Sequence, residues 1–478
     1  MSAALIDQLL HLLGSKGVST DAHDMAPWLT DWRGRWTGRA LALVSPASTA
    51  EVAAVVKLAA AARVPLVPQG GNTSMVGGAT PSDAGDALIL SLRRMNAVRL
   101  LDAQANLAVA EAGVILSNFH DAALAIGRRF PLTLGGKGSA TIGGLVSTNA
   151  GGTQVLRFGT MRKLVLGLEA VLPDGSIYDG LASLKKDNRG YDLTQLLIGA
   201  EGTLGVVTAA SLRLMPAIAD RAAAWIGLNS PHTALKLLRW LEARTGDQIE
   251  SFEIIPADTL GLVLKHIPNT RAPFEGAHEW HVLVEYVESV GAAATEALTT
   301  LIAAAHEAGL LDDAVIAASE AQIDAFWHMR DSISEAERAD GPAVQHDISV
   351  PVDAMPDFMI DAARVIEAEF GGTRVSAFGH LGDGNVHFHV RAPFGVDRAA
   401  WQNDVGTPAS HRVHDLVVAA HGSISAEHGI GQMKRAELLR LSDPARLYAL
   451  RAIKSAFDPL NIMNPGKLIP LASDALVQ

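Results

Sequence analysis

The chain has 478 residues, of which 49% are hydrophobic and 19% charged, and its net charge is −12. This length exceeds what one hydrophobic core supports, so two or three domains are expected, and the apolar content excludes a disordered chain. The acidic balance and the lack of a basic tract argue against a nucleic-acid partner. Cysteine is absent, which excludes disulfides, cysteine-bound zinc and iron–sulfur clusters in this polypeptide.

The N-terminal residues predict an amphipathic helix, because Leu5, Leu9, Leu12 and Leu13 fall on one helical face. They lack the basic region and the continuous apolar stretch of a signal peptide. No run of about 18 apolar residues occurs in the sequence, so no transmembrane helix is expected. We therefore expect a soluble, cytoplasmic protein.

Hydrophobic periodicity predicts an α/β unit near the N-terminus, with a helix over 49–62 that begins at an N-capping Ser or Thr and a buried strand at 64–67. Short strands are predicted between residues 88 and 114. The later predicted elements are strands at 164–171, 206–214, 251–255, 280–287, 347–352, 375–378 and 385–391, and helices at 233–245, 292–308, 355–370 and 408–420.

Glycine is concentrated in residues 131–205, which hold 15 of the 44 glycines. Two stretches stand out, Pro68-Gln-Gly-Gly-Asn-Thr-Ser-Met-Val-Gly-Gly78 and Pro131-Leu-Thr-Leu-Gly-Gly-Lys-Gly-Ser-Ala-Thr-Ile-Gly-Gly-Leu-Val-Ser-Thr-Asn-Ala-Gly-Gly152. Glycines let the main chain approach a ligand, and consecutive N–H groups bind anions, so a pyrophosphate is favoured over glycine pairs that merely form turns. Neither stretch has the Gly-x-Gly-x-x-Gly or Walker A spacing, which argues against NAD and ATP.

A third stretch runs from Asp187 to Val207. The motif Lys186-Asp-Asn-x-Gly-Tyr-Asp-Leu overlaps its start, and Gly199-Ala-Glu-Gly-Thr-Leu-Gly205 lies near its end. Together with the Pro-Gln-Gly-Gly-Asn-Thr loop and Asn149-Ala-Gly-Gly152, it resembles the FAD-binding domain of the vanillyl-alcohol-oxidase (PCMH-type FAD) superfamily. Within that superfamily the chain is most similar to the FAD-dependent D-2-hydroxy-acid dehydrogenases, the D-2-hydroxyglutarate dehydrogenases in particular. The resemblance covers about residues 40–468.

The resemblance implies an α+β fold. A two-subdomain PCMH-type FAD-binding domain is expected over 38–217, after an N-terminal helical segment at 1–37. An α+β substrate or cap domain with an antiparallel sheet is expected over 218–425. The C-terminal segment, 426–478, would return to the FAD domain and complete the active site.

The resemblance also implies that the loops at 69–74 and 135–144 hold the FAD pyrophosphate. Covalent FAD in relatives often uses a histidine of the first glycine-rich loop, and this loop has none, so non-covalent FAD is expected. The residues implied to bind FAD are Pro68, Gly70, Gly71, Asn72, Thr73, Ser74, Gly78, Pro131, Leu134, Gly135, Gly138, Ser139, Thr141, Ile142, Gly143, Gly144, Ser147, Asn149, Gly152, Glu201, Gly202, Gly205, Val206, Val207 and Asn464.

Seven of the 17 histidines fall within residues 380–428. Residues 378–390 predict a strand, a Gly-Asp-Gly turn and a second strand, on which His387 and His389 share a face. The turn can bring His380 beside His387, and imidazoles with a carboxylate suit a divalent transition metal, although such histidines could equally be ordinary hydrogen-bonded residues. The resemblance implies that His380, His387 and Glu427 bind a divalent metal ion, with zinc as the expected metal, and that His428 is the catalytic base.

Arg330 and Ser334 are spaced by four residues on a predicted helix, so both could reach a substrate carboxylate. The alternative is a surface ion pair of Arg330 with Glu335 or Glu337. The further residues implied to bind substrate are Gln345, Asn385 and His389.

The chain departs from the family pattern at three of these positions. Gln345 stands where dicarboxylate-specific relatives carry Lys, His389 replaces an Asn, and Ser334 replaces a Thr. A protonated His346 or His389 could supply the missing positive charge.

The expected reaction is metal-assisted, FAD-dependent oxidation of a D-2-hydroxy acid, D-2-hydroxyglutarate to 2-oxoglutarate, with hydride transfer from Cα to flavin N5. D-Lactate or D-malate is the alternative substrate. A metal hydrolase with purely structural glycine loops, and a non-catalytic flavoprotein, are the competing classes. An electron-transfer flavoprotein or a quinone is the expected acceptor, and the family suggests a homodimer.

Overall fold

The computed structural model describes residues 2–184 and 186–470. Its internal contacts divide the chain into two units. The first unit holds the described residues up to Gly152, then Phe158–Ala217, then those from Glu427 onward. The second unit holds Thr153–Arg157 and Ile218–Ala426. The short helix α6 (Val155–Phe158) crosses the boundary in the sequence.

The first sheet of the first unit has four strands in the order β1-β2-β4-β3, and β2, β4 and β3 are parallel. The helix α3 begins as predicted, because Ser48 Oγ accepts a hydrogen bond from Glu51 N at 3.2 Å. The predicted N-terminal helix buries Leu5, Leu9 and Leu13 against this sheet. The elements are α1 (Ser2–Leu13), β1 (Val18–Ser19), α2 (Ala22–Leu29), β2 (Ala42–Val44), α3 (Thr49–Ala62), β3 (Leu66–Gln69) and β4 (Leu88–Ser91).

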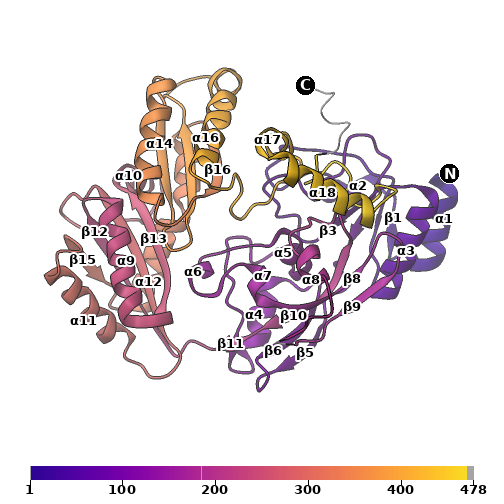
Figure 1. Cartoon of the computed structure of the whole chain (residues 1–478), viewed down its shortest axis with the longest axis horizontal. Coiled ribbons are helices and arrows are strands. Elements are labelled where there is room, and N and C mark those ends of the chain that lie inside the picture. Colours follow the sequence, from indigo (N-terminus) through magenta and orange to yellow (C-terminus); the bar gives the residue numbers. More distant parts are fainter. Residues whose placement is uncertain (1, 185, 471–478) are drawn as a thin grey trace. The chain divides into compact units, whose positions relative to one another are not determined.

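The second sheet of the first unit is antiparallel, in the order β5-β6-β10-β8-β9. The helices α17 and α18, yellow in Figure 1, lie among these N-terminal elements, so the C-terminal segment belongs to the first unit. The elements are β5 (Val98–Asp102), β6 (Leu107–Glu111), α4 (Leu116–Leu124), β7 (Arg128–Arg129), α5 (Ile142–Thr148), α7 (Met161–Leu164), β8 (Val165–Val171), β9 (Ile177–Gly180), α8 (Leu193–Leu197), β10 (Val206–Arg213), β11 (Met215–Pro216), α17 (Arg435–Leu441) and α18 (Pro444–Phe457).

The second unit is built on one seven-stranded sheet in the order β15-β12-β14-β13-β17-β18-β16, and the pairs between its strands are antiparallel. The strands are β12 (Asp220–Leu228), β13 (Ile249–Pro256), β14 (Trp280–Glu288), β15 (Asp313–Ile316), β16 (Ala343–Ser349), β17 (Arg374–His380) and β18 (Asn385–Arg391).

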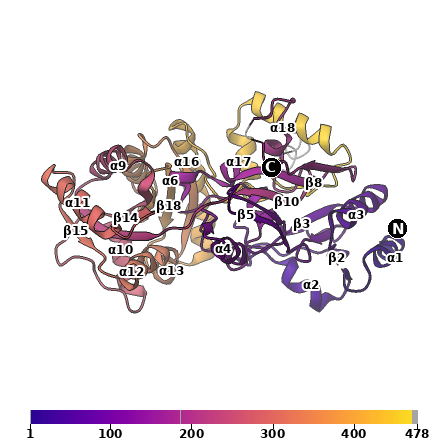
Figure 2. The ribbon, with the colours of Figure 1, turned by 90° about the horizontal axis from the view of Figure 1, so that it is seen from below.

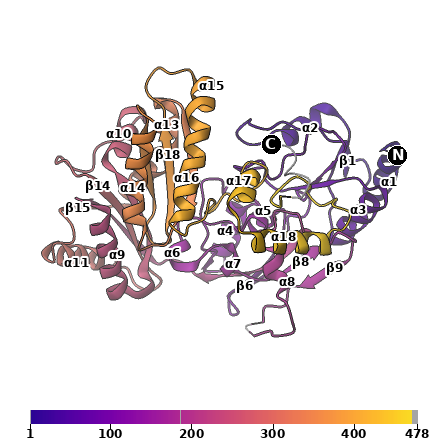
Figure 3. The same ribbon diagram turned by 45° about the horizontal axis from the view of Figure 1, so that its top comes forward.

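Helices cover both faces of this sheet, and Figure 2 shows the strands between two helical layers. On one face Trp225, Leu283 and Phe378 pack against Phe326 and Ile333 of the covering helices. On the other face lie α14 and α16, which Figure 3 shows beside β18. The helices are α9 (Pro231–Thr245), η1 (Gly246–Gln248), α10 (Ala257–His266), α11 (Ala294–Glu307), α12 (Glu320–Asp331), α13 (Ile333–Asp340), α14 (Met355–Glu369), α15 (Arg398–Trp401), η2 (Gln402–Gly406) and α16 (Thr407–Ala419).

The α+β class is confirmed, and the structure differs from the predicted elements at three places. The strand β12 has no counterpart among the predicted elements. The strand predicted at 347–352 is β16 and begins at Ala343. The helix predicted to carry both Arg330 and Ser334 is interrupted at Ser332, so the two residues lie in α12 and α13. Among the described helices, none is both long and apolar enough to cross a lipid bilayer.

Candidate active site

The two glycine-rich loops of the first unit pack backbone against backbone. A Cβ atom on Gly71 would lie 1.8 Å from the carbonyl oxygen of Ser139, and one on Gly70 would lie 2.3 Å from Thr141 Oγ1. Side chains at these two positions would therefore separate the loops. The first motif is glycine-rich because the loop at 69–74 must approach the loop at 135–144 this closely.

Several polar atoms of these loops and of the adjoining C-terminal segment are buried without a partner among the described residues. Thr141 lies at the N-terminus of α5 and is 6% exposed, and its Oγ1 has no hydrogen-bond partner in this part of the chain. Gln69 Oε1 and, in the C-terminal segment, Asn464 Oδ1 are in the same state. A buried hydroxyl or amide oxygen without a partner is costly, so these atoms fit a loop region that binds a polar ligand such as a pyrophosphate.

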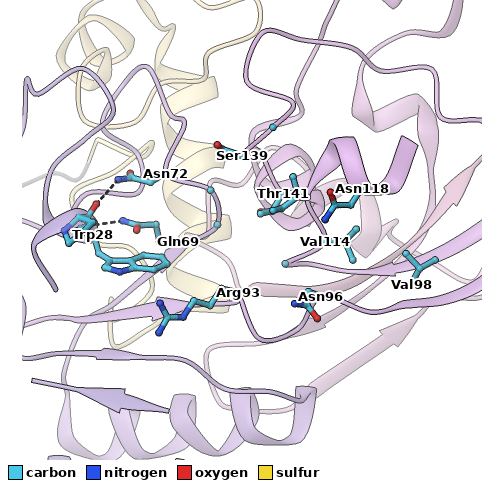
Figure 4. Close-up of a pocket in the computed structure, with 16 residues that line it drawn as sticks. Trp28, Gln69, Asn72, Arg93, Asn96, Val98, Val114, Asn118, Ser139 and Thr141 are labelled. Atoms are coloured by element: carbon cyan, nitrogen blue, oxygen red, sulfur yellow. Dashed lines mark hydrogen bonds between the residues drawn. The ribbon is translucent and has the colours of Figure 1, made fainter. Parts of the chain in front are cut away.

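The loops form one side of a cavity of about 590 Å³ in the first unit (Figure 4). Six of the residues implied to bind FAD line it, namely Gly70, Gly71, Asn72, Gly138, Ser139 and Thr141. Apart from Gln69 of the first glycine-rich stretch, its other polar and aromatic lining residues lie outside the glycine motifs, so no sequence pattern indicated them. They include Trp28, Arg93, Asn96 and Asn118.

Several of the residues implied to bind FAD make hydrogen bonds within their own loop or to neighbouring segments of the first unit. Asn72 Nδ2 donates to Thr30 O at 2.8 Å, and Ser74 Oγ accepts from Gly78 N at 3.2 Å. Asn149 has a left-handed backbone, and its Oδ1 accepts from Thr160 Oγ1 and Arg162 N, both at 2.9 Å. Their side chains therefore shape the loops.

The remaining residues of this set lie in the same unit. A Cβ on Gly152 would lie 2.2 Å from Thr133 O, and one on Gly202 would lie 3.1 Å from Pro68. Thr73 lies in the first glycine-rich loop. The others occupy the loop before α5, α5 itself, or the start of β10 and the residue before it, namely Pro131, Leu134, Gly135, Ile142, Gly143, Gly144, Ser147, Gly205, Val206 and Val207.

Glu201 links the glycine motifs to the C-terminal segment. Its buried carboxylate accepts hydrogen bonds from Ile430 N at 2.7 Å and Gly431 N at 2.8 Å, and its carbonyl oxygen accepts one from Asn464 Nδ2 at 2.7 Å. Burial outweighs these donors and raises the pKa of Glu201 above its ordinary value. The side chain of Glu201 therefore clamps the loop that follows residues 427 and 428.

Glu427 and His428 begin the C-terminal part of the first unit, on the loop that Glu201 clamps. A Cβ on Gly151 would lie 2.7 Å from Glu427 Oε1, so the predicted metal-binding carboxylate packs on the glycine motif at 149–152. The other two predicted metal ligands, His380 and His387, belong to the second unit.

His380 and His387 lie together in the second unit, on β17 and β18, with ring centroids 5.4 Å apart. Burial opposes the charged form of His380, but the Glu253 carboxylate outweighs it and raises the pKa of His380 to about 9. Burial, together with Arg330 and His380, lowers the pKa of His387 well below its ordinary value. His387 is therefore neutral at pH 7, and a neutral imidazole suits metal binding.

Arg330 does not form the surface ion pair considered from the sequence. Its Nε and Nη2 atoms lie 2.9 and 2.8 Å from Glu253 Oε2, and Nη2 lies 3.3 Å from His380 Nε2. Glu253 is fully buried, and the positive charges of Arg330 and His380 outweigh burial and hold the pKa of Glu253 below its ordinary value. Ser334 is half-buried in α13.

His389 pairs with a buried carboxylate, Glu337, which the sequence suggested as a surface partner of Arg330. The Nδ1 atom of His389 contacts Glu337 Oε2 of α13, and Oε1 of Glu337 is buried without a hydrogen-bond partner within residues 2–184 and 186–470. Gln345 lies directly opposite His389 in the register of β16 and β18. Both side chains therefore lie on the sheet face that carries His387.

His346 cannot supply the charge that Gln345 lacks, which corrects one expectation. Its Nδ1 contacts Phe388 O at 2.8 Å and its Nε2 contacts Ser410 Oγ at 2.9 Å, on the opposite face of the sheet. Asn385 donates from Nδ2 to Asp347 Oδ1 and Ile348 O, whereas its Oδ1 is buried and no described residue hydrogen-bonds to it.

Two family models match the chain. "FAD binding domain" matches residues 40–180, and "FAD linked oxidases, C-terminal domain" matches residues 218–468. "D-2-hydroxyglutarate dehydrogenase, mitochondrial" of Arabidopsis thaliana is 35% identical, over 96% of this chain and 80% of that protein. "Putative D-lactate dehydrogenase C713.03, mitochondrial" of Schizosaccharomyces pombe is 33% identical, over 94% of this chain and 86% of that protein.

Among solved structures, p-cresol methylhydroxylase with substrate bound superposes with a TM-score of 0.75 at 15% identity, covering 97% of this chain and 96% of that one. At this identity the match shows the fold alone, and it confirms the PCMH-type architecture. Both relatives are named as mitochondrial proteins, so the cytoplasmic location expected from the sequence is wrong.

Proposed function

Because the chain belongs to the FAD-linked oxidases and is an FAD-dependent D-2-hydroxy-acid dehydrogenase, we propose that it oxidises D-2-hydroxyglutarate to 2-oxoglutarate with the help of a divalent metal ion. The observation that carries the proposal is the match, along almost the whole chain, to a protein named D-2-hydroxyglutarate dehydrogenase. The buried group of His380, His387 and Arg330 adds chemical support.

The glycine-rich loops of the first unit would hold FAD non-covalently, because the first loop has no histidine and the chain has no cysteine. When bound, FAD would supply a two-electron acceptor at flavin N5 for the hydride that leaves Cα of the substrate. The buried, unpartnered Thr141 Oγ1 and the close approach of Gly70 and Gly71 to the second loop fit this role. An electron-transfer flavoprotein or a quinone is the proposed electron acceptor.

His380, His387 and Glu427 would hold the metal, which we assign as zinc. A divalent ion held by these residues would supply Lewis acidity that lowers the pKa of the substrate hydroxyl group. The donor types fit, because two imidazoles and one carboxylate suit a divalent transition metal. Nδ1 of His380 contacts Glu253, so Nε2 would be its coordinating atom, and metal binding there would displace the proton that the raised pKa of His380 retains near pH 7. His428 would take the hydroxyl proton, since a base with a pKa near neutrality is efficient.

Arg330 would bind the substrate carboxylate, with Ser334, Gln345, Asn385 and His389 lining the same site. The guanidinium edge with Nε faces Glu253, so a carboxylate would be bound through Nη1 and Nη2. Asn385 Oδ1 is a buried acceptor without a partner among the described residues, and it could receive a hydrogen bond from a substrate hydroxyl.

D-Lactate or D-malate is the second candidate substrate, and two observations favour the monocarboxylate, D-lactate. Gln345 supplies no positive charge for a distal carboxylate. The carboxylate of Glu337 contacts His389, so its negative charge offsets any positive charge on that imidazole. The group around residue 345 is therefore less cationic than a dicarboxylate site requires.

The test is a panel of D- and L-2-hydroxy acids assayed with an artificial dye acceptor, with and without a chelator. The proposal expects turnover of D-acids only, loss of activity after metal removal, and the highest kcat/KM for D-2-hydroxyglutarate. A higher kcat/KM for D-lactate moves the assignment to the second candidate. Equal rates on L-acids, or full activity after thorough metal removal, would refute the mechanism.

The Gln345→Lys variant sharpens the choice of substrate. The added cation should raise kcat/KM for D-2-hydroxyglutarate relative to D-lactate by about tenfold, the equivalent of roughly 1.4 kcal/mol for one charge-assisted contact. Gln345→Met, which fills the position without a charge, is the control. An unchanged ratio in the lysine variant would show that residue 345 does not contact the distal carboxylate.

A further inference from the structure

Glu253 is a buried acid that no sequence motif indicated. It lies on β13, paired in register with His380 of β17, and only 1% of its surface is exposed. A carboxylate in such a position is stable only where it is paired and hydrogen-bonded. Its partners are therefore what explain its presence.

Both partners are residues of the candidate active site. Glu253 Oε1 accepts a hydrogen bond from His380 Nδ1 at 2.6 Å, and Oε2 lies 2.9 and 2.8 Å from Nε and Nη2 of Arg330. The Nη2 atom in turn lies 3.3 Å from His380 Nε2. One carboxylate thus orders the imidazole and the guanidinium at the same time.

The contact with Nδ1 fixes which nitrogen of His380 can bind an ion. A metal-binding imidazole commonly donates its other N–H to a carboxylate, which sets the tautomer and the orientation of the ring. With Nδ1 directed at Glu253, Nε2 is the atom that would bind a metal, in place of its present contact with Nη2 of Arg330. The Arg330 edge that contains Nε is held in the same way, so the plane of the guanidinium is fixed relative to that Nε2 atom.

We propose that Glu253 is a positioning residue, which orients His380 for metal binding and Arg330 for binding of the substrate carboxylate as one coupled group. The inference rests on the proposed function, because it takes His380 as a metal ligand and Arg330 as a substrate ligand. It adds that the two roles share one carboxylate. A 2-hydroxy acid presents its hydroxyl and carboxylate on adjacent carbons, so a fixed spacing between the two protein groups matches the substrate.

The test uses the FAD-loaded full chain and the Glu253→Gln variant. An amide accepts at one atom only and presents an N–H group to the other partner, so it cannot serve His380 and Arg330 together. We expect Zn²⁺ affinity, measured by equilibrium dialysis against a metal buffer, to fall by about 10- to 100-fold. The KM for the best D-2-hydroxy acid should rise about tenfold or more even at saturating Zn²⁺, because Arg330 is also released.

Glu250→Gln is the matched control. Glu250 lies on the same strand, is also 1% exposed, and its Oε2 pairs with Arg157 Nη1 at 2.8 Å. The control should lower the melting temperature without changing Zn²⁺ affinity or KM. If Glu253→Gln also changes only the melting temperature, Glu253 is a structural ion-pair residue and the inference is wrong.

Glu253→Asp decides the question if the glutamine variant does not fold. It keeps the charge but shortens the side chain by one methylene, so Zn²⁺ affinity and KM should change less than in a folded glutamine variant and in the same directions. Unchanged values in a folded aspartate variant would overturn the inference. The wild-type protein tests the proposed function separately: lack of Zn²⁺ binding by the wild type refutes the metal site itself, whereas the ratio of variant to wild type tests Glu253.

Discussion

The two units of the molecule place their candidate functional groups by different means. In the first unit the glycine-rich loops approach one another through the main chain, as at Gly71 and Ser139. In the second unit, buried carboxylates on β13 and α13 hold histidines of neighbouring strands, as in the pair of Glu253 and His380. Main-chain packing leaves a local motif in the sequence, whereas a side-chain pair across a sheet does not.

The difference also concerns what each unit tolerates. A loop that packs through its main chain has no room for a Cβ atom, so its sensitivity is steric. A buried ionic group is sensitive to charge and to hydrogen bonding, and it responds to pH. Substitutions that add only bulk should therefore affect the first unit most, and substitutions that change only charge should affect the second unit most.

The largest effect is expected for Gly71→Ala in the first unit. The added Cβ would lie 1.8 Å from Ser139 O, a main-chain atom that cannot rotate away. We expect a loss of about 3 kcal/mol or more of stability and a fall of bound FAD to below roughly a tenth of the wild-type amount. Visible flavin absorption measures the bound FAD, and thermal unfolding measures the loss of stability.

Gly138→Ala is the control for this variant. Gly138 belongs to the second glycine-rich loop, but its Cβ would meet no protein atom within 4 Å. The stability of the Gly138→Ala variant without FAD should equal that of the wild type. Any loss of flavin in this variant would then show that the new Cβ blocks the ligand, and not that it disturbs the packing of the two loops. Normal flavin content and stability in Gly71→Ala would contradict the main-chain packing described for the first unit.

How far the sequence could predict the molecule follows the same division. The pair of strands at 375–391 and the shared face of His387 and His389 followed from alternation alone. The same alternation places His346 on the face opposite Gln345. It therefore argues, from the sequence alone, against the expectation that His346 supplies the positive charge missing at Gln345. The strand β12 was missed because it begins Asp220-Arg-Ala-Ala-Ala, and alanine has a low strand propensity.

Glu253 and Glu337 could not be recognised from the sequence. Glu253 meets His380 only because β13 pairs with β17, and 127 positions separate the two residues. The local sequence does not distinguish Glu337 from the other acidic residues of its helical segment. It is buried only because α13 packs on the sheet face that carries His389. Register and helix packing, which are long-range properties, decide both cases.

The second prediction concerns pH and the second unit. His281 of β14 is 5% exposed, its Nδ1 has no partner in the described part of the chain, and its ring stacks on Phe274. Burial, with a smaller effect of the neighbouring His278, lowers its pKa from 6.5 to about 4. Between these pH values the unfolded chain binds a proton that the folded chain refuses, so stability falls as pH falls from 6.5 to 4.

His281→Phe should remove this dependence. Between pH 6.5 and 4 the free energy of unfolding of the wild type should fall by about 3 kcal/mol more than that of the variant. This value follows from a difference of roughly 2.5 pKa units between the unfolded and the folded chain, at about 1.4 kcal/mol per unit. Urea unfolding at pH 7 and at pH 4 measures the difference, and His11→Asn, at an exposed position of α1, is the control. Parallel losses in wild type and His281→Phe would show that His281 becomes protonated within the folded protein.

The smallest effect is expected at a glycine that neither packs closely against another main-chain segment nor lies beside a buried ionic group. Gly261 lies inside α10 of the second unit and is exposed, and a Cβ atom at this position would meet no other atom within 4 Å. Gly261→Ala should therefore stabilise the protein by about 1 kcal/mol, because alanine loses less backbone entropy in a helix. Thermal unfolding measures the change.

Gly127→Ala in the first unit is the comparison for this variant. The surroundings of Gly127 are equally open, but its φ is +69°. Gly127→Ala should be destabilised by about 1 kcal/mol, since a left-handed backbone disfavours a Cβ atom. Melting temperatures that move in opposite directions would separate backbone conformation from packing space, and a shift of the same sign in both variants would contradict that separation.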